Sequence, residues 1–298
     1  MLANREKKKK LNKIFIMKWI LEELDENKVK SRLEEILKGK SKLFSEKEIL
    51  RKILNSIDLT TLEGKDTNKA ATELCKQARS FHSHRPDVPN VAAVCFYPPF
   101  ASLAKAQLQN TGINVACVAG AFPSGQSPLS VRIAEVKYTV EQGADEIDMV
   151  ISRGRFLEED YEYVFNEVKE IKAACGNAHL KVILETGELK DLNKVKLASE
   201  IAIAAGADFI KTSTGKMQPA ATLEAFIVML DVIKAHYEKT GIMIGIKPAG
   251  GISEVEVAKQ YLLVLETVLG EPWMNNKWFR IGASRLAGRV LEALLRLK

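Results

Sequence analysis

The chain has 298 residues, of which 28% are charged, and its formal net charge is +6. This length suits one large domain with an extension, and the modest charge is only a weak indication of nucleic-acid binding. The four cysteines form no Cys-x-x-Cys pair and lie apart from the four histidines, so neither a disulfide framework nor a zinc site is predicted. No stretch has the roughly 18 apolar residues of a membrane span. We therefore expect a cytoplasmic protein with no metal, no cofactor and no membrane partner.

Residues 1–50 are predicted to form a basic, helical extension of a main domain at 51–298. The lysine run 7–10 could bind nucleic acid, but a solvated tail is the favoured interpretation because no aromatic residues are interleaved with it. Apolar residues recur at helical spacing over 12–38, and a second helix is expected after Ser45, where Glu48 would complete a capping box. We expect these helices to lie outside the main domain as lid or docking helices, and they could join two chains in a homodimer.

After the extension, short β-rich runs alternate with helical patterns eight times, which is typical of a parallel sheet with right-handed crossovers. Eight units favour a closed (β/α)8 barrel. A doubly wound sheet usually carries a Gly-x-Gly-x-x-Gly turn after its first strand, and this chain has none. The predicted strands are 55–59, 91–96, 114–119, 146–151, 180–184, 209–212, 243–247 and 280–282.

The predicted strands carry ionisable and hydroxyl-bearing side chains at or near their C-terminal ends, although they are rich in apolar residues. In a (β/α)8 barrel the active site lies at these C-terminal ends. A packed core has no use for such groups, because burying an unpaired charge is costly. The residues concerned are Asp58, Thr60, Cys95, Asp148, Glu185, Thr186, Lys211, Thr212, Ser213, Lys247 and Ser284.

Lys211 and Lys247 end neighbouring strands, so they could form a like-charge pair. A lysine attacks a carbonyl only as the neutral amine, and a pKa of about 10.4 leaves very little of that form at pH 7. A second cation about 4 Å away would lower the pKa by roughly three units. We predict that Lys211 forms a Schiff base with a substrate carbonyl and that Asp148 moves protons. A structural salt bridge between Asp148 and one lysine is the alternative.

Glycine-rich segments follow the last three strands, and they put small residues where backbone N–H groups can approach an anion. In barrels, the loops after strands seven and eight commonly hold phosphate. A phosphorylated substrate is therefore expected. The segments are Gly215-Lys216, Pro248-Ala249-Gly250-Gly251 and Gly282-Ala283-Ser284.

From about residue 52, the chain resembles the deoxyribose-phosphate aldolases. These are class I aldolases, which use a lysine Schiff base and no metal or cofactor to cleave 2-deoxy-D-ribose 5-phosphate reversibly into acetaldehyde and D-glyceraldehyde 3-phosphate. The two lysine motifs are highly specific when they occur together. The matching motifs are Ile57-Asp58-Leu59-Thr60-Thr61-Leu62, Ala93-Val94-Cys95-Phe96-Tyr97-Pro98, Glu146-Ile147-Asp148-Met149-Val150-Ile151, Asp208-Phe209-Ile210-Lys211-Thr212-Ser213-Thr214-Gly215-Lys216, Gly245-Ile246-Lys247-Pro248-Ala249-Gly250-Gly251 and Arg280-Ile281-Gly282-Ala283-Ser284.

The resemblance implies Lys211 as the Schiff-base lysine, Lys247 as the second lysine and Asp148 as the acid/base partner. It also implies that several residues line the substrate pocket, although a core role is favoured for Cys95. The predicted substrate-binding residues are Asp58, Thr60, Cys95 and Thr212, and the predicted phosphate-binding residues are Gly215, Lys216, Gly250, Gly251, Gly282, Ser284 and Arg285.

Two positions depart from the family pattern. Ser253 stands where the family often has arginine, and Arg285 stands where it usually has serine or threonine. We hypothesise that Arg285 replaces, from the neighbouring loop, the cation lost at Ser253.

Two other functions stay open. A Schiff-base aldolase of the same barrel type could act on a different phosphorylated sugar. A basic binding protein could use the barrel as a scaffold and the lysine run 7–10 as its interaction arm.

Overall fold

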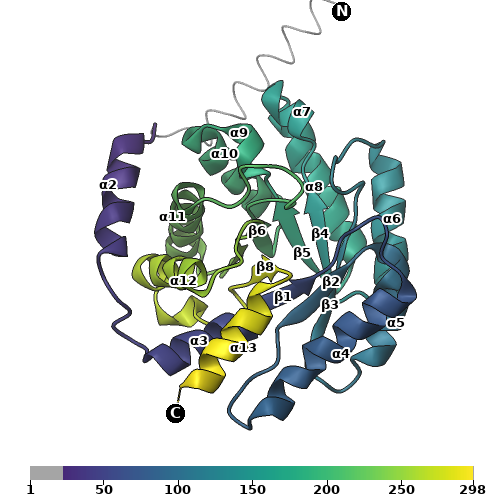
Figure 1. The fold of residues 1–298 in the computed structure, drawn as a ribbon. Helices are drawn as coiled ribbons and strands as arrows, with labels where there is room; N and C mark the ends of the chain where they lie inside the picture. Colours follow the sequence, from purple (N-terminus) through teal and green to yellow (C-terminus); the bar gives the residue numbers. More distant parts are fainter. Residues whose placement is uncertain (1–22, 298) are drawn as a thin grey trace, which may run out of the picture.

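The computed structural model describes residues 23–297, and its eight parallel strands form one sheet in the order β7-β6-β5-β4-β3-β2-β1-β8. Two parallel bridges, Ile246 to Phe279 and Ala249 to Gly282, link β7 to the β8 segment and close the barrel. Figure 1 shows the ring of helices around it. The predicted (β/α)8 barrel is thereby confirmed. The strands are β1 (Ile57–Thr60), β2 (Ala93–Phe96), β3 (Asn114–Val118), β4 (Glu146–Val150), β5 (His179–Ile183), β6 (Phe209–Lys211), β7 (Gly245–Lys247) and β8 (Ile281–Ala283).

Every predicted strand overlaps an observed one. The first strand begins later than predicted, at Ile57, because the preceding helix continues to Asn55. The helices from α4 onward are α4 (Asn68–His84), α5 (Ala101–Gln107), α6 (Leu129–Glu141), α7 (Arg153–Leu157), α8 (Tyr161–Cys175), α9 (Thr186–Leu189), α10 (Leu192–Ala204), α11 (Leu223–Thr240), α12 (Val255–Leu269) and α13 (Leu286–Arg296), with short 3-10 turns η1 (Pro98–Phe100) and η2 (Glu271–Trp273).

Two helices precede the barrel, α2 (Glu26–Leu37) and α3 (Glu46–Asn55). The predicted capping box is present, since the Ser45 hydroxyl accepts from the Glu48 N–H and the Glu48 carboxylate accepts from the Ser45 N–H. The lysine run 7–10 and the start of the helix expected over 12–38 lie outside the described residues.

The α2 helix lies along α11 and α12, and α3 packs on α12 and α13 (Figure 1). The ion pair of Arg32 with Asp231 joins α2 to α11. Leu50, Ile53 and Leu54 of α3 are fully buried in the same apolar cluster as the barrel strands. A division near residue 50 and a homodimer through these helices both remain predictions.

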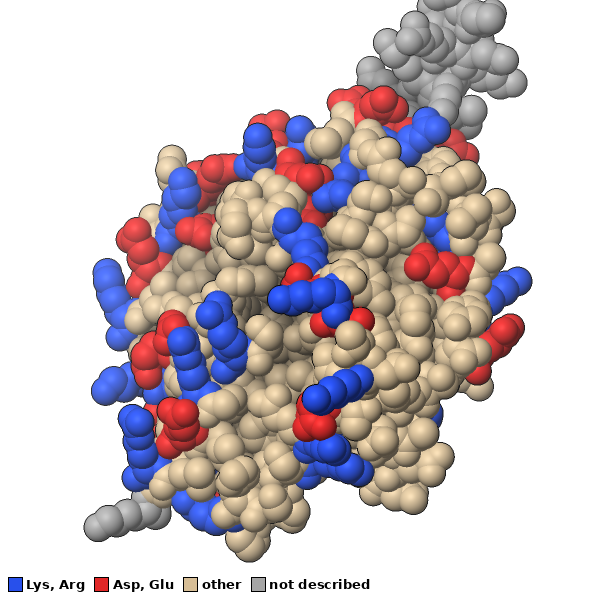
Figure 2. All heavy atoms as spheres, turned by 45° about the vertical axis from the view of Figure 1, so that its right-hand side comes forward, with Lys and Arg blue, Asp and Glu red and all other residues tan. Residues whose placement is uncertain are grey.

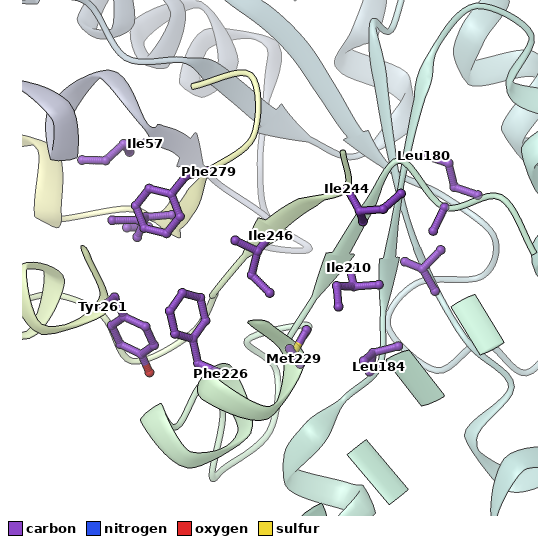
Figure 3. Close-up of a cluster of buried hydrophobic side chains, with 14 of the residues drawn as sticks. Ile57, Leu180, Leu184, Ile210, Phe226, Met229, Ile244, Ile246, Tyr261 and Phe279 are labelled. Carbon is purple, nitrogen blue, oxygen red and sulfur yellow. The ribbon is translucent and has the colours of Figure 1, made fainter. Parts of the chain in front are cut away.

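The main apolar core lies between the strands and the surrounding helices. Ile210 of β6 and Ile246 of β7 point outward onto Phe226 and Met229 of α11 (Figure 3). Because side chains alternate along a strand, the neighbours of these isoleucines point into the barrel. Lys211 and Lys247 therefore face the interior.

Charged side chains of both signs are interspersed on the face drawn in Figure 2, without a continuous patch of either sign. Among residues 23–297 there is no helix with the length and apolar character needed to cross a membrane.

Candidate active site

Seven charged side chains are buried inside the barrel, each at most 4% exposed. Their inward direction follows from strand alternation, since Glu146 and Asp148 of β4 are separated by the outward Ile147. We call this set the charged cluster, and it consists of Asp58 on β1, Glu146 and Asp148 on β4, Lys181 on β5, Lys211 on β6, Lys247 on β7 and Arg280 just before β8.

Asp148 lies at the centre of the charged cluster. Its Oδ2 accepts from Lys211 Nζ at 2.7 Å and from Lys247 Nζ at 2.7 Å. The two lysines are paired in register across β6 and β7, which brings both amines to the same oxygen. The structure thus brings together the three residues predicted to be catalytic.

The other Asp148 oxygen, Oδ1, accepts from Lys181 Nζ at 3.0 Å. A structural ion pair and a contact with the lysine pair therefore coexist on one carboxylate. Burial raises the pKa of Asp148, but Lys181, Lys211 and Lys247 together hold it well below its usual range. Asp148 is consequently ionised, which is the form that a general base requires.

Further ion pairs link Asp58, Glu146 and Arg280 to one another and to the lysines. Arg280 donates to Asp58 Oδ1 at 2.7 Å and to Glu146 Oε1 at 2.7 Å, and Lys181 also bonds Glu146. Asp58 further pairs with Lys247 at 2.5 Å. Asp58 is therefore held by buried cations.

The charged cluster contains three carboxylates and four cations, so it carries one surplus positive charge when every member is ionised. Burial lowers the pKa of Lys247, but Asp148 and Asp58 outweigh this effect and raise it overall. The carboxylates raise the pKa of Lys181 and Arg280 in the same way. Of the four cations, Lys211 has the lowered pKa, so its deprotonation relieves the surplus charge.

The lowered pKa of Lys211 has two causes. Burial is the larger and Lys247 adds to it, while Asp148 acts in the opposite direction. The sequence predicts repulsion by Lys247 as the cause, and in the structure it is the smaller of the two. A neutral Lys211 still donates an N–H to Asp148, which orients the amine lone pair away from that carboxylate.

Glu146, Lys181 and Arg280 were not among the predicted site residues. Glu146 begins β4, Lys181 is in the middle of β5 and Arg280 precedes β8, whereas the prediction looked toward the C-terminal ends of the expected strands. The available signal is period-two alternation, because Glu146 stands two residues before Asp148 and Arg280 two residues before Gly282.

A cavity of about 460 Å³ opens at the C-terminal ends of the strands, between the loops that follow β1, β6, β7 and β8. Lys211 contributes to its lining, so the proposed nucleophile is accessible from the cavity. The predicted residues that line it are Thr60, Lys211, Gly215, Lys216, Gly250, Gly251, Gly282, Ser284 and Arg285.

Asp58, Cys95 and Thr212 were predicted to bind substrate, but the lining of this cavity does not include them. Cys95 is fully buried among small apolar side chains inside the barrel, and burial raises the pKa of its thiol. The Thr212 hydroxyl accepts from the Ala249 N–H at 3.0 Å and thereby fixes the β7 loop. Direct substrate contact by these three residues remains a prediction.

Glycine is required where the β6 and β7 loops touch. Gly215 and Gly250 have φ values of +79° and +85°. A Cβ on Gly250 would lie 2.6 Å from the Ala220 Cβ and 3.1 Å from the Gly215 Cα. Side chains are thus excluded at this wall of the cavity, and the backbone itself faces an incoming group.

Two cations besides Lys211 line the cavity. Lys216 on the β6 loop pairs with Glu63 on the β1 loop at 2.9 Å. The Arg285 guanidinium makes no hydrogen bond or ion pair with any residue of the described range 23–297, and its side chain is exposed. Ser253, which also lines the cavity, carries no charge. Arg285 is therefore able to receive an anion, as hypothesised.

The β6 loop is anchored from beneath by Glu185, a buried residue with a left-handed φ of +57°. Its carboxylate accepts from the Thr214 N–H at 3.1 Å and from the Thr214 hydroxyl at 2.5 Å. The same hydroxyl accepts from the Lys216 N–H at 3.1 Å. A non-glycine residue in this conformation costs of order 1 kcal/mol, which the loop contacts offset.

Among residues 23–297, no three side chains of His, Cys, Asp or Glu are grouped as metal ligands. Metal independence remains a prediction.

Comparison with known proteins identifies the family of the chain. Residues 52–262 match the DeoC/LacD family of aldolases. A relative from Caenorhabditis elegans is 45% identical over 256 residues, covering 85% of this chain and 84% of the relative. The human protein named deoxyribose-phosphate aldolase is 43% identical over 252 residues, covering 81% of this chain and 79% of the human one.

A solved structure of deoxyribose phosphate aldolase from Aeropyrum pernix superimposes with a TM-score of 0.65 at 26% identity, covering 86% of this chain and all of that one. The chain therefore belongs to the DeoC/LacD aldolase family and is an enzyme of the lyase class, related to the deoxyribose-phosphate aldolases.

Proposed function

We propose that this enzyme cleaves 2-deoxy-D-ribose 5-phosphate reversibly to acetaldehyde and D-glyceraldehyde 3-phosphate through a Schiff base on Lys211. The observation that carries the proposal is the position of Lys211, which lines the cavity, has a lowered pKa and bonds the ionised Asp148. The names of the relatives support the substrate.

In this mechanism the neutral Lys211 amine attacks the C1 aldehyde of the open-chain sugar, and loss of water gives an iminium ion. Asp148 takes the proton of the C3 hydroxyl, directly or through water, while the electrons of the C2–C3 bond move into the iminium. Glyceraldehyde 3-phosphate leaves, and the enamine is protonated at C2. Hydrolysis of the resulting iminium releases acetaldehyde and restores Lys211.

Lys247 has two roles in this proposal. Its ammonium, held charged by Asp148 and Asp58, helps to keep Lys211 neutral. It also bonds the Asp148 oxygen that Lys211 contacts, so it can share protons with that carboxylate. Lys181 has the same charge but bonds the other oxygen of Asp148.

The far end of the cavity suits the phosphate of the sugar. Arg285 has no carboxylate partner among residues 23–297, and glycine backbone of the β6 and β7 loops faces the same space. One five-carbon chain can therefore present its aldehyde to Lys211 and its phosphate to these loops. The cytoplasmic location, like the use of phosphorylated sugars and aldehydes as the small-molecule partners, remains a prediction.

The test is reductive trapping. Borohydride added with acetaldehyde should fix a two-carbon adduct at Lys211, located by peptide mass mapping, and Lys211→Leu should abolish both the adduct and retro-aldol turnover. An adduct at another residue, or turnover by Lys211→Leu, contradicts the proposal. A panel of phosphorylated sugars separates it from a Schiff-base aldolase with another substrate.

A further inference from the structure

The two cations at the outer end of the cavity differ in their partners. Arg285 has no carboxylate partner among the described residues, whereas Lys216 Nζ lies 2.9 Å from Glu63 Oε1. Both Glu63 and Lys216 line the cavity. A carboxylate is thus already bound to one of the two cations that a substrate phosphate would meet.

The pair crosses the cavity mouth. Glu63 lies in the loop after β1 and Lys216 in the loop after β6, and β7 and β8 stand between these strands in the barrel. The loops after β7 and β8 line the same cavity. The ion pair therefore joins two loops that are not neighbours, over the space that their neighbours enclose.

Glu63 extends from a turn that is itself fixed. Its N–H donates to Asp66 Oδ2 at 2.9 Å, and the Thr61 hydroxyl bonds the same carboxylate at 2.9 Å. The carboxylate of Glu63 is consequently presented to Lys216 from an ordered backbone. The side chains are 61% exposed for Glu63 and 31% exposed for Lys216, so substrate can reach the pair.

We propose that Glu63 is a specificity-determining residue, which competes with the substrate phosphate for Lys216. The proposal rests on the proposed function. A phosphate group carries more negative charge than a carboxylate and offers three acceptor oxygens, so it can displace Glu63 from Lys216. A sugar without phosphate leaves the pair in place. Glu63 therefore reduces the preference of the enzyme for phosphorylated over unphosphorylated sugars.

The expected effect is modest, because exposed ion pairs are weak. Removing the competing carboxylate should tighten phosphate binding by about two- to fivefold, the range typical of an exposed pair. Because such pairs are screened by salt, the difference should fade toward roughly 1 M ionic strength. A merely structural role of Glu63 would not give this salt dependence.

Titration calorimetry of inorganic phosphate into the full chain tests the proposal without turnover. Glu63→Gln should bind phosphate about two- to fivefold more tightly than the wild type at low salt. The matched control is Glu73→Gln, which removes a carboxylate of nearly equal exposure, 60%, from the Glu73–Lys76 pair on α4. The control should bind as the wild type does. Unchanged or weaker binding by Glu63→Gln overturns the proposal.

Two further measurements complete the test. The ratio of kcat/KM for 2-deoxyribose 5-phosphate to that for 2-deoxyribose should rise two- to fivefold in Glu63→Gln, about the effect of one exposed pair, and an unchanged or lower ratio overturns the proposal. In a Lys216→Met background, Glu63→Gln should no longer tighten phosphate binding, and a full effect there also overturns it. If the wild type cleaves neither sugar, the proposed function fails, while the phosphate titration still decides about Glu63.

Discussion

The charged cluster inside the barrel and the charges at the cavity mouth use the same residue types under opposite conditions. In the cluster, every cation bonds a carboxylate and no member is more than 4% exposed, so charge imbalance has no solvent to relieve it. At the mouth, Lys216 and Glu63 are partly exposed and Arg285 is unpaired among the described residues. The cluster can therefore set a protonation state, whereas the mouth can only adjust binding.

Of the substitutions considered, replacing Lys247 should have the largest effect, because it changes the charge balance of the charged cluster. In Lys247→Met, Lys181 and Arg280 balance only two of the three carboxylates, so Lys211 must keep its proton to balance the third. The pKa of Lys211 should rise, and the neutral amine at pH 7 should become scarcer. We expect kcat/KM at pH 7 to fall on the order of 100- to 1,000-fold, equivalent to a shift of two to three pKa units.

The pH profile of kcat/KM checks this reason. Its acid limb should move to higher pH in Lys247→Met, because a raised Lys211 pKa delays formation of the amine. The control is Lys76→Met, which removes an exposed cation of α4 and should leave the profile unchanged. A lower rate with an unmoved acid limb would show that Lys247 acts by proton transfer alone.

Glu146→Gln tests the cluster as a source of stability. The substitution keeps the shape of the side chain but leaves Arg280 and Lys181 without one of their carboxylates. Breaking a buried pair in this way should lower the free energy of unfolding by about 3 kcal/mol, measured by urea denaturation at pH 7.

The loss of stability in Glu146→Gln should depend on pH. Burial raises the pKa of Glu146, but Lys181 and Arg280 hold it below its usual range. Its stabilisation is therefore complete above the unfolded-state pKa of about 4.3 and fades as the pH falls toward the folded-state value. The difference in unfolding free energy between wild type and Glu146→Gln should shrink below about pH 4, the onset of that window. A constant difference would contradict the ionised role of Glu146.

The sequence predicted the centre of the cluster and Asp58, but not Glu146, Lys181 or Arg280. Lys211 and Lys247 end their strands, where barrel topology alone brings side chains together, and Asp148 lies in the middle of β4 within reach of both. To predict Glu146 and Arg280, one must know which residues of each strand face inward, and this depends on the strand boundaries. Those boundaries are uncertain by a residue or two from the sequence, and a shift of one reverses the facing.

Loop contacts were beyond prediction for a different reason. Glu63 and Lys216 are 153 residues apart and meet only because the turn at Asp66 and the anchor at Glu185 fix their loops. Neither the turn at Asp66 nor the anchor at Glu185 is marked by a hydrophobic periodicity in the sequence. The lining of the cavity by Thr60, Arg285 and the glycines was nevertheless predicted, since each lies at the end of a strand or in the loop that follows it.

Arg285→Ala tests the cavity mouth, where the expected effects are smaller than in the charged cluster. Loss of an unpaired cation should raise KM for the phosphorylated sugar about tenfold, the effect of one charge-assisted hydrogen bond of about 1.5 kcal/mol. The control Arg296→Ala removes a cation of the same helix, α13, at its other end. If KM for the phosphorylated sugar is unchanged in Arg285→Ala, the hypothesis that Arg285 replaces the missing cation at Ser253 is wrong.

The smallest expected effect is that of Thr214→Val, which tests how firmly the mouth is tied to the scaffold. Valine keeps the shape of threonine but neither donates to Glu185 nor accepts from the Lys216 N–H, so the β6 loop should loosen. KM for the phosphorylated sugar should rise about fivefold, corresponding to one net hydrogen bond of about 1 kcal/mol.

Thr214→Ser, which retains the hydroxyl, should restore most of this loss. Because Lys211 lies on β6 itself, before the loosened loop, the borohydride adduct should form in both variants. A loss of adduct formation in Thr214→Val would show that the cavity mouth and the charged cluster are coupled. The mouth would then affect the chemistry at Lys211 as well as substrate binding.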